Sequence, residues 1–490
     1  MGSLIFFVIL YLAITIAIGL YAARKVHGAK DYLVAGRSLP LYINMATVFA
    51  TWFGAETVLS VSATFSRDGL SGIPADPFGA TACLIFVALF FAKAFYRMDL
   101  LTLGDFYKKR YNKTIEVVTS SIIVISYLGW TSAQLTALGL VLWVISGGAL
   151  TLTQAIIIGT VIVMFYTIWG GMWSVAFTDM FQTVVIIIGL FIVAWFVGDL
   201  AGGATKVIST AYEQGKLNPF PSGGSKEWLM WIAAFATIAL GSIPQQDVFQ
   251  RVTSAKDEKT AVRGTLIGAI VYFIIAFIPM FIAFSALMIE PRLVELFKSE
   301  DAREIQRILP DIILGQTPLY IQVLFFGALL SAILSTASGA LLAPTALFAN
   351  NVMKPFLPHL SDHNLLKLVR VTLVVFTVAA LIFAVNSKST MYEMIQNAYK
   401  VTLAGAFAPL AFGLFWKRTT AAGAALSIFA GLGTWMGMEV LISNGLETIW
   451  PPQMVGLVFG IVAIVVGSLL TQPKHGQGHG HGHPHKDHGH

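Results

Sequence analysis

The sequence carries little charge and almost no cysteine. Of its 490 residues only 11% are Asp, Glu, Lys or Arg, whereas 56% are hydrophobic. Soluble domains usually carry about 25% charged residues, so this composition excludes an ordinary water-soluble protein. Cys83 is the only cysteine and lies in an apolar run, which excludes a disulfide framework and a thiol metal cluster. The sequence contains no nucleophile–base pair, phosphate loop or cofactor motif, so we do not expect an enzyme.

Long apolar runs take the place of the missing charge. Each is about 20 residues long, the length that an α-helix needs to cross a hydrocarbon core ~30 Å thick. We therefore expect an all-α membrane protein of about thirteen transmembrane helices, folded as one domain over residues 1–473. The expected spans are 3–23, 40–64, 75–96, 115–145, 151–170, 174–199, 228–250, 261–289, 317–352, 366–386, 390–416, 421–442 and 453–471. The first run lacks a basic n-region and a cleavage site, which favours a retained helix over a signal peptide.

The distribution of Lys and Arg predicts the orientation of these helices. An odd number of spans places the two termini on opposite sides of the membrane. The loops and terminus on one side, from Arg24 to Lys486, collect twenty Lys and Arg residues, and those on the other side, from Arg67 to Lys388, collect nine. Because basic residues concentrate in cytoplasmic loops, we expect a cell-membrane protein with its N-terminus outside and its C-terminus in the cytoplasm. The net charge of +6 then reflects topology and does not indicate nucleic acid binding.

The last segment, residues 474–490, is a low-complexity run of histidine and glycine. We expect a disordered cytoplasmic tail, because glycine gives the histidines no fixed geometry. Weak metal binding is the alternative, since neutral imidazoles are ligands for Zn, Ni or Cu. The candidate ligands are His479, His481, His483 and His485.

Two expected spans contain residues that interrupt helices. Gly54 stands beside the ionisable Glu56 in the second span, and Gly241 and Pro244 lie in the seventh. Proline removes a backbone donor and clashes with the preceding turn, so a break is expected there. In transporters built from inverted repeats, broken helices at corresponding positions enclose the binding site. The repeats would cover residues 40–199 and 228–416, with 3–23, 421–442 and 453–471 peripheral. The alternative is that both interruptions are ordinary packing kinks.

The ninth expected span presents a row of small side chains. Ser331, Ser335, Ser338 and Gly339 fall at helical spacing and share one face. Such a face allows close helix packing. The hydroxyl groups of Ser335 and Thr336 would also suit a hard cation, which prefers oxygen ligands and would accept carbonyl groups freed by a break in the second span. Spacing alone leaves both alternatives open.

Asp179 is a carboxylate placed one or two turns inside the sixth expected span. An ionisable residue inside the membrane is expensive, so it indicates a functional role. The pair Gly170–Gly171 marks a tight turn just before it. Asp179 could instead be satisfied as a helix cap or by neighbouring Ser and Thr side chains.

Four segments together resemble the sodium:solute symporter family. They are "WGGMWSVAFTDMFQ", "FQRVTSAKDEKTAVRG", "LSAILSTASG" and "FAPLAFGLFWKRTTAAGA", and they occur in the family's order and at its separations. The similarity extends over about residues 5–470. It implies a LeuT-type fold of two inverted five-helix repeats that works by alternating access.

The resemblance also implies a sodium site. In the family this site uses carbonyl groups of the first broken helix and hydroxyl groups of the helix that matches the ninth span. The matching positions here are Ala50, Phe53 and Ala332 for the carbonyl groups and Ser335 and Thr336 for the hydroxyl groups. Some members hold a second sodium ion at positions that match Asp179 and Ser338. Gly339 replaces a further hydroxyl group of that second site.

Within the family, the segments "ATW", "FFAK", "GGMWSVAFTD" and "IPQQDVFQRV" resemble the high-affinity choline transporter branch. Trp52 and Trp130 match positions of its choline cage, where aromatic faces attract a quaternary ammonium group. Ordinary packing is the alternative role for both. Gln245 replaces a tryptophan of that cage, and "STASGA" lacks the acidic residue of the branch. A smaller polar or zwitterionic solute that Gln245 could hydrogen-bond therefore fits at least as well as choline.

Glu56 and Thr57 match positions that face the solute in sugar-transporting relatives. Glu56 could bind the solute, relay a proton, or fix the break by accepting backbone hydrogen bonds. We expect a sodium-coupled symporter, with Na+ as coupling ion, that imports a small polar organic solute resembling either an amino acid such as proline or choline and betaine. A proton-coupled carrier that uses Glu56 or Asp179 is the alternative, and a membrane solute sensor is a more distant one.

Overall fold

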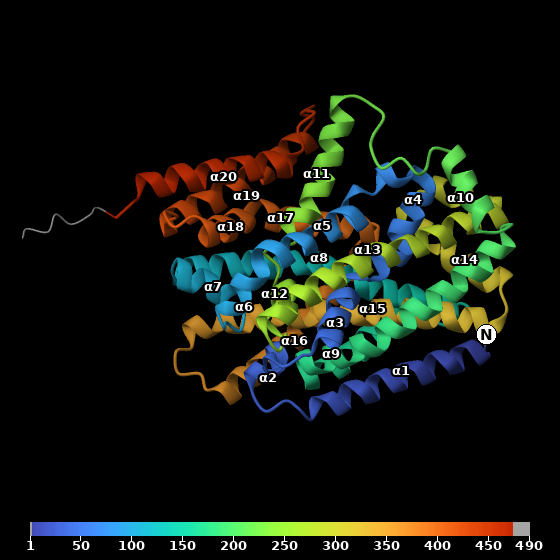
Figure 1. Ribbon diagram of the computed structural model, residues 1–490, viewed down its shortest axis with the longest axis horizontal. Helices are drawn as coiled ribbons and strands as arrows, with labels where there is room; N and C mark the ends of the chain where they lie inside the picture. Colours follow the sequence, from blue (N-terminus) through green and yellow to red (C-terminus); the bar gives the residue numbers. More distant parts are fainter. Residues whose placement is uncertain (1, 474–490) are drawn as a thin grey trace, which may run out of the picture.

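The protein is almost entirely helical. A computed structural model describes residues 2–473, and within this range the only β-pairing is an isolated bridge between Leu39 and Ala255. The predicted all-α class is confirmed (Figure 1). The α-helices are α1 (Gly2–Ala23), α2 (Ala29–Val34), α3 (Leu41–Trp52), α4 (Ser62–Asp68), α5 (Ala80–Phe86), α6 (Ala92–Arg97), α7 (Leu103–Arg110), α8 (Lys113–Ile145), α9 (Leu152–Leu200), α10 (Ala204–Glu213), α11 (Ser225–Gly241), α12 (Gln246–Thr253), α13 (Glu258–Ile289), α14 (Ile308–Gln316), α15 (Leu319–Leu347), α16 (Asp362–Asn386), α17 (Met391–Gly405), α18 (Phe407–Phe415), α19 (Ala421–Ser443) and α20 (Pro452–Leu470). Shorter segments with tighter or wider turns are η1 (Ala35–Arg37), η2 (Glu56–Val61), η3 (Leu70–Gly72), η4 (Pro74–Gly79), η5 (Val87–Phe91), η6 (Pro291–Lys298), η7 (Ala302–Arg307), η8 (Phe348–Met353) and η9 (Lys354–Phe356).

The number of spans depends on how the bent helices are counted. Within residues 2–473, nine helices are long and apolar enough to cross a membrane, and three bent pairs raise the number to twelve. Helix α9 has 49 residues, which at ~1.5 Å per residue is more than twice the thickness of a hydrocarbon core. Gly171 interrupts α9 with φ 50° and ψ −134°. Division of α9 at Gly171 gives two spans, and the total then agrees with the thirteen expected from the sequence.

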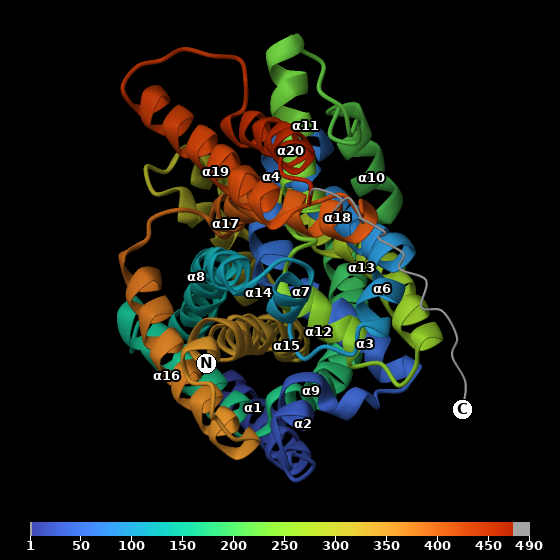
Figure 2. The ribbon, with the colours of Figure 1, turned by 90° about the vertical axis from the view of Figure 1, so that its left-hand side faces the viewer.

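Helix α15 lies at the centre of the bundle. In the end-on view it is surrounded by α3, α8, α9 and α12, and it contacts all four (Figure 2). Every α15 residue from Ala328 to Leu347 is buried. Helix α1 lies at one edge, and α19 and α20 pack against each other at the opposite edge. The polar side chains of α15 from Ser331 onward are therefore shielded from both lipid and bulk water.

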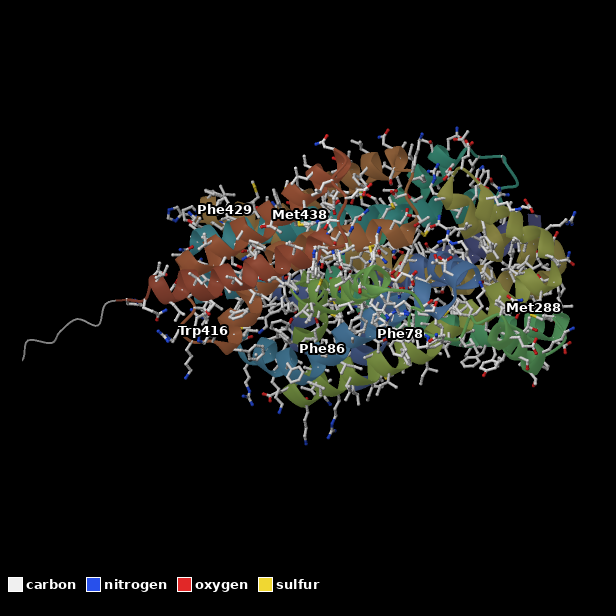
Figure 3. All side chains as sticks on the ribbon, turned by 90° about the horizontal axis from the view of Figure 1, so that it is seen from above. Phe78, Phe86, Met288, Trp416, Phe429 and Met438 are labelled. Carbon is white, nitrogen blue, oxygen red and sulfur yellow. The ribbon has the colours of Figure 1, made fainter. Side chains whose placement is uncertain are left out.

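The outer surface is rich in apolar side chains. Phe429 is 78% exposed and Trp195 is 80% exposed, and Figure 3 shows Phe429 on the outside of the bundle. Soluble proteins rarely expose apolar patches larger than a few hundred Å². Such a surface is typical of helices that face lipid, where all backbone groups must be satisfied within the helix.

In the part of the chain that the structure describes, three spans are bent at short breaks between helices, whereas the sequence predicted two. The expected bends occur between α3 and η2–α4, by 54°, and between α11 and α12, by 47°. The third bend, of 46°, separates α17 from α18 at Ala406. Pro409 follows in the first turn of α18 and has no N–H to donate to the Gly405 carbonyl group, so the helix is not continued through this point.

Gly171 forms the turn that divides α9. Its positive φ lies in a region that only glycine enters readily. A Cβ atom at this position would lie 2.5 Å from the Tyr32 carbonyl oxygen of α2. The Tyr32 hydroxyl group donates to the Thr167 carbonyl group, 3.2 Å away, at the end of the preceding half of α9. Helix α2 thus packs directly on the turn and holds it in place.

We predict that Gly171→Ala destabilises the protein by at least about 2 kcal/mol, because it adds backbone strain to a steric clash. Thermal unfolding of the purified protein in detergent would measure this loss. Gly437→Ala is the matched control, since a Cβ atom at Gly437 meets open space. Equal melting temperatures for the two variants would contradict the role assigned to Gly171.

Candidate functional site

The break in the second span brings the backbone of α3 against α15. Helix α3 ends at Trp52, and Phe53 has non-helical φ −84° and ψ 82°. A Cβ atom at Gly54 would lie 2.4 Å from Glu56 Oε2 and 2.9 Å from Thr336 Oγ1. A Cβ atom here would therefore force the Glu56 carboxylate and the Thr336 hydroxyl group to shift, and the break itself lies against the hydroxyl groups of α15.

Buried oxygen atoms converge at this break. Ser335 Oγ donates to the carbonyl groups of Ala50, at 2.8 Å, and Ala332, at 3.0 Å. Thr336 Oγ1 lies 3.2 Å from the same Ala50 oxygen. Four of the five predicted sodium ligands thus form one cluster, and Phe53 is the residue at which the helix ends next to it. Oxygen groups of this kind, withdrawn from water, suit a hard cation.

The residues predicted for a second ion do not form an equally complete cluster. Asp179 Oδ2 accepts a hydrogen bond from Thr47 Oγ1 of α3 at 2.5 Å, so a threonine hydroxyl group from another helix, and not a helix cap, satisfies this oxygen atom. Ser338 Oγ donates to the Ser335 carbonyl group at 3.0 Å. Among residues 2–473, Asp179 Oδ1 and both polar atoms of the Gln182 side chain have no hydrogen-bond partner.

A buried arginine lies beside this region. A Cβ atom at Gly339 would lie 2.6 Å from an Nη atom of Arg251. Arg251 is 2% exposed, and its Nε donates to Thr51 Oγ1 at 2.9 Å. The space that a side chain at position 339 would occupy is therefore taken by the guanidinium group of Arg251, which carries a positive charge. Arg251 was not predicted as part of the site, because it lies one residue beyond the expected span 228–250.

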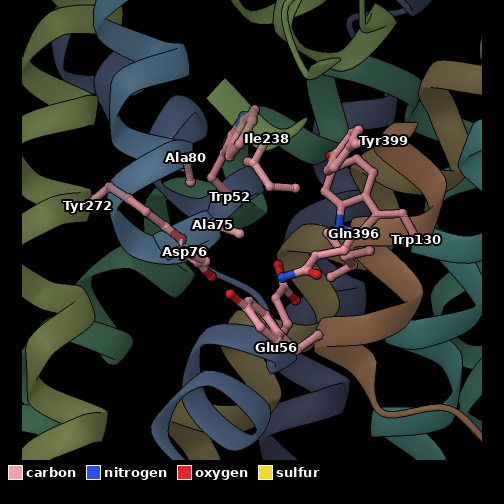
Figure 4. A pocket seen from close by; sticks show the side chains of 12 residues that line it. Trp52, Glu56, Ala75, Asp76, Ala80, Trp130, Ile238, Tyr272, Gln396 and Tyr399 are labelled. Carbon is pink, nitrogen blue, oxygen red and sulfur yellow. Dashed lines mark hydrogen bonds between the residues drawn. The ribbon is translucent and has the colours of Figure 1, made fainter. Parts of the chain in front are cut away.

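A small cavity lies next to the break (Figure 4). Its volume is about 20 Å³, close to the space that one water molecule needs. Both broken spans border it, because Trp52 and Glu56 come from the first and Ile238 from the second. The lining residues are Trp52, Glu56, Ala75, Asp76, Ala80, Trp130, Ile238, Tyr272, Tyr392, Ile395, Gln396 and Tyr399.

Three of the five predicted solute-binding residues line this cavity. They are Trp52, Glu56 and Trp130. Thr57 lies just outside the lining, and its hydroxyl group donates to Asp76 Oδ2 at 3.0 Å. Thr57 therefore positions a carboxylate at the cavity wall.

Gln245 does not belong to the residues that line the cavity. It follows Pro244 in the non-helical turn between α11 and α12. Its Nε2 lies 3.3 Å from Ser126 Oγ and 3.2 Å from Thr402 Oγ1. The backbone turns its amide toward α8 and α17, so Gln245 fixes the second break to its neighbours.

Gln134 of α8 links Glu56 to the first break. Its Nε2 donates to Glu56 Oε2 at 2.5 Å, and its Oε1 accepts the Ala55 N–H at 3.2 Å. One amide side chain thus satisfies a backbone donor freed by the break and holds the carboxylate at the cavity. The sequence did not indicate Gln134, because its partners lie 78 and 79 residues away.

Asp76 is a second carboxylate at the cavity, supplied by η4. Its Oδ1 accepts a hydrogen bond from the Tyr272 hydroxyl group of α13, and its Oδ2 accepts one from Thr57. Asp76 was not predicted as a site residue, because it is the second residue of the expected span 75–96, where an acidic residue would normally face water. The fold instead buries it, with only 7% of its surface exposed.

A thin layer separates the cavity from a wider depression of about 560 Å³. Tyr392 and Gln396 of α17 line both spaces. The depression also contains Asp68, Lys226 and Glu227, charged side chains that belong in an aqueous environment. The cavity is therefore close to water on one side of the membrane.

Paired broken helices around buried oxygen atoms and a small central cavity define a secondary-active membrane transporter. The chain belongs to the sodium:solute symporter family, whose family model matches residues 32–431. The coupling ion of this family is Na+. Membership of a transporter family confirms that the protein is not an enzyme.

Named relatives include transporters of different solutes. The chain is 27% identical to the high-affinity choline transporter 1 of Caenorhabditis elegans over 410 residues, which cover 79% of this chain and 69% of the relative. It is 24% identical to the sodium/glucose cotransporter of Vibrio parahaemolyticus over 460 residues, covering 86% of this chain and 82% of the relative. The predicted resemblance to the choline transporter branch is confirmed at this level.

Solved structures of similar shape confirm the LeuT-type fold. A Na+-coupled sialic acid symporter, solved in a substrate-bound outward-open state, superposes with a TM-score of 0.80 at 19% identity, covering 96% of this chain and 98% of the other. A transporter of the nucleobase-cation-symport-1 family gives a TM-score of 0.60 at 14% identity, covering 90% of this chain and 95% of the other.

The metal ligands predicted in the tail, His479, His481, His483 and His485, lie outside the described residues.

We predict that Gly54→Ala weakens sodium binding by about tenfold or more, because the added methyl group enters the space between Glu56 and Thr336. Sodium that binds only the folded protein raises its melting temperature, so a titration of NaCl against KCl at constant ionic strength measures the effect. Gly437→Ala is expected to retain the wild-type response. An unchanged sodium response in Gly54→Ala would show that the ion binds elsewhere.

Proposed function

We propose that this protein is a sodium-driven symporter that imports a small polar organic solute by alternating access. The observation that carries the proposal is the contact of the Ser335 and Thr336 hydroxyl groups with the Ala50 carbonyl group at the break of α3. Family membership supports sodium coupling in general. The cluster supports a particular place for the ion in this chain, next to the cavity.

Sodium would bind between the carbonyl groups of Ala50, Phe53 and Ala332 and the hydroxyl groups of Ser335 and Thr336. A hydroxyl group has lone pairs as well as a hydrogen atom and can rotate to suit its partner. The hydroxyl groups that now donate to Ala50 would turn their lone pairs to the ion. Because the ligands come from α3 and α15, ion binding would join these two helices and favour one of the transporter's states.

We propose that one sodium ion accompanies each solute. Arg251 lies against Gly339 and carries a positive charge near the second candidate position at Asp179 and Ser338, which disfavours a further cation. One ion is thermodynamically sufficient, since a membrane potential contributes ~2.3 kcal/mol per charge per 100 mV, or roughly 50-fold in accumulation. A proton relay through Glu56 or Asp179 is the competing coupling mode, and both are buried carboxylates.

The solute would bind in the cavity between the two broken spans. The layer formed by Tyr392 and Gln396 separates that cavity from the charged depression, so its displacement would open the path for the solute. A cavity of about 20 Å³ admits no organic solute unless the surrounding helices move apart. This supports a closed arrangement that opens to either side in turn.

The proposed repeats run from about residue 40 to 199 and from about 228 to 416, with α1, α19 and α20 outside them. We propose that the N-terminus is outside and the C-terminus in the cytoplasm, because basic residues concentrate on the side that would then face the cytoplasm. The depression with Asp68, Lys226 and Glu227 then opens to the outside, which is the direction from which uptake begins.

We predict that Ser335→Ala/Thr336→Ala lowers sodium-driven uptake by about tenfold or more, because two hydroxyl ligands are lost. The measurement uses proteoliposomes with and without an inward sodium gradient and a panel of amino acids, choline, betaine, organic amines, carboxylates and sugars.

Ser331→Ala is the matched control for this experiment. Ser331 lies on the same face of α15, but its hydroxyl group bonds to the Gly327 carbonyl group and to Tyr11, away from the break. Uptake that ignores sodium and follows a proton gradient would contradict the sodium site and transfer the coupling role to Glu56 or Asp179.

A further inference from the structure

Two carboxylates share the cavity beside the first break. Glu56 is 6% exposed and Asp76 is 7% exposed, and both line the same space. Figure 4 shows them on neighbouring sides of it, with Tyr272 pointing at Asp76. They come from different segments, η2 and η4, so the fold and not the local sequence brings them together.

Only neutral groups hold these carboxylates. Gln134 donates to Glu56, and Thr57 and Tyr272 donate to Asp76. A carboxylate offers about four acceptor positions, so each has capacity left toward the cavity. Among the described residues that line the cavity, none is Lys, Arg or His. Buried charge of one sign requires a partner of the other sign.

The proposed sodium ion accounts for one of the two negative charges. Glu56 Oε2 and Thr336 Oγ1 both lie within 3 Å of the position that a Cβ atom would take on Gly54. Glu56 therefore borders the ion site as well as the cavity. Asp76 lies on the neighbouring side of the cavity with Tyr272, and its charge is left for the solute to balance.

We infer that the solute is a small organic cation with at least one N–H on its charged nitrogen, a protonated primary, secondary or tertiary amine, and that Asp76 is the residue that selects it. The inference rests on the proposed function and names its substrate class. The nitrogen lies between Glu56 and Asp76, and the carbon skeleton lies against Trp52, Trp130 and Tyr399. These aromatic rings add cation–π attraction and an apolar wall.

Other solute classes fit this cavity less well. A sugar or other neutral solute leaves the charge of Asp76 unbalanced. A zwitterion brings a third carboxylate into the same low-dielectric space, where like charges repel strongly. A quaternary ammonium balances the charge but has no N–H, so the free acceptor positions of both carboxylates lose water without gaining a donor.

The test compares four compounds of nearly the same skeleton on purified wild-type protein in saturating NaCl at neutral pH. The probes are N,N-dimethylethanolamine, choline, 3,3-dimethyl-1-butanol and glycine betaine, which are a protonated tertiary amine, a quaternary ammonium, a neutral isostere and a zwitterion. Isothermal titration or melting-temperature shifts give their affinities. We expect the amine to bind about tenfold or more tightly than choline, because choline has no N–H for the charged, buried hydrogen bond. The neutral isostere lacks both this N–H and the positive charge, so we expect it not to bind.

Asp76→Asn tests the assigned residue. We expect it to lower the affinity for the amine by about tenfold or more and to retain the sodium-induced rise in melting temperature. Asp76→Glu, which restores the charge, should recover part of the preference for the amine over its neutral isostere. Asp199→Asn, an exposed carboxylate at the end of α9, is the control and should bind all four probes as the wild type does. If Asp76→Asn does not fold, the wild-type ranking of the four probes still decides.

The outcomes separate this inference from the proposed function. The inference is overturned if the wild type prefers betaine, choline or the neutral isostere. It is also overturned if Asp76→Asn still selects the amine. Either result leaves sodium symport intact. Loss of every sodium effect in wild-type protein would instead overturn the proposed function. A further wild-type readout is the current across a proteoliposome membrane, where cotransport of sodium and an amine carries about two charges per solute.

Discussion

The architecture depends on a contact between two backbones that regular helices would not permit. Helix α3 stops at Trp52, and the absence of a side chain on Gly54 lets the broken segment lie directly against α15. The hydroxyl groups of Ser335 and Thr336 then reach the Ala50 carbonyl group. Because α15 occupies the centre of the bundle, each helix that packs around it is positioned relative to this contact. The cluster of buried oxygen atoms and the cavity share the same break, so a movement of one would displace the other.

The sequence revealed the features whose causes are local. Apolar runs, the Gly54 and Pro244 interruptions and the row of small residues on α15 follow from periodicity and backbone chemistry, and the structure contains each of them. The turn at Gly171 was also predicted, because two adjacent glycines separate two long apolar runs. The third bend was not predicted, although Pro409, whose missing N–H prevents the helix from continuing there, lies inside the expected span 390–416.

The missing parts of the site are those that only tertiary structure defines. In the sequence, Asp76 lies at the outer end of an expected span. In the structure it lines the cavity, because Tyr272 and Thr57 from two other segments hydrogen-bond to it. Gln134 and Arg251 have partners far away in the chain. Gln245 stands next to a predicted break, yet the conformation of that break turns its amide toward Ser126 and Thr402. The position of Gln245 in the sequence correctly indicated that it lies at the second break, but it did not indicate the direction of its side chain.

The thin layer of Tyr392 and Gln396 has an electrical consequence. A membrane potential falls mainly where water is excluded, because a water-filled depression conducts and low-dielectric protein does not. The charged depression brings water to within one side-chain layer of the cavity. Most of the voltage drop therefore lies across the protein on the opposite side of the cavity. On the proposed route, an ion that entered through the depression would cross little of the electric field, and the step that moved charge through the field would be the passage from the cavity to the far side.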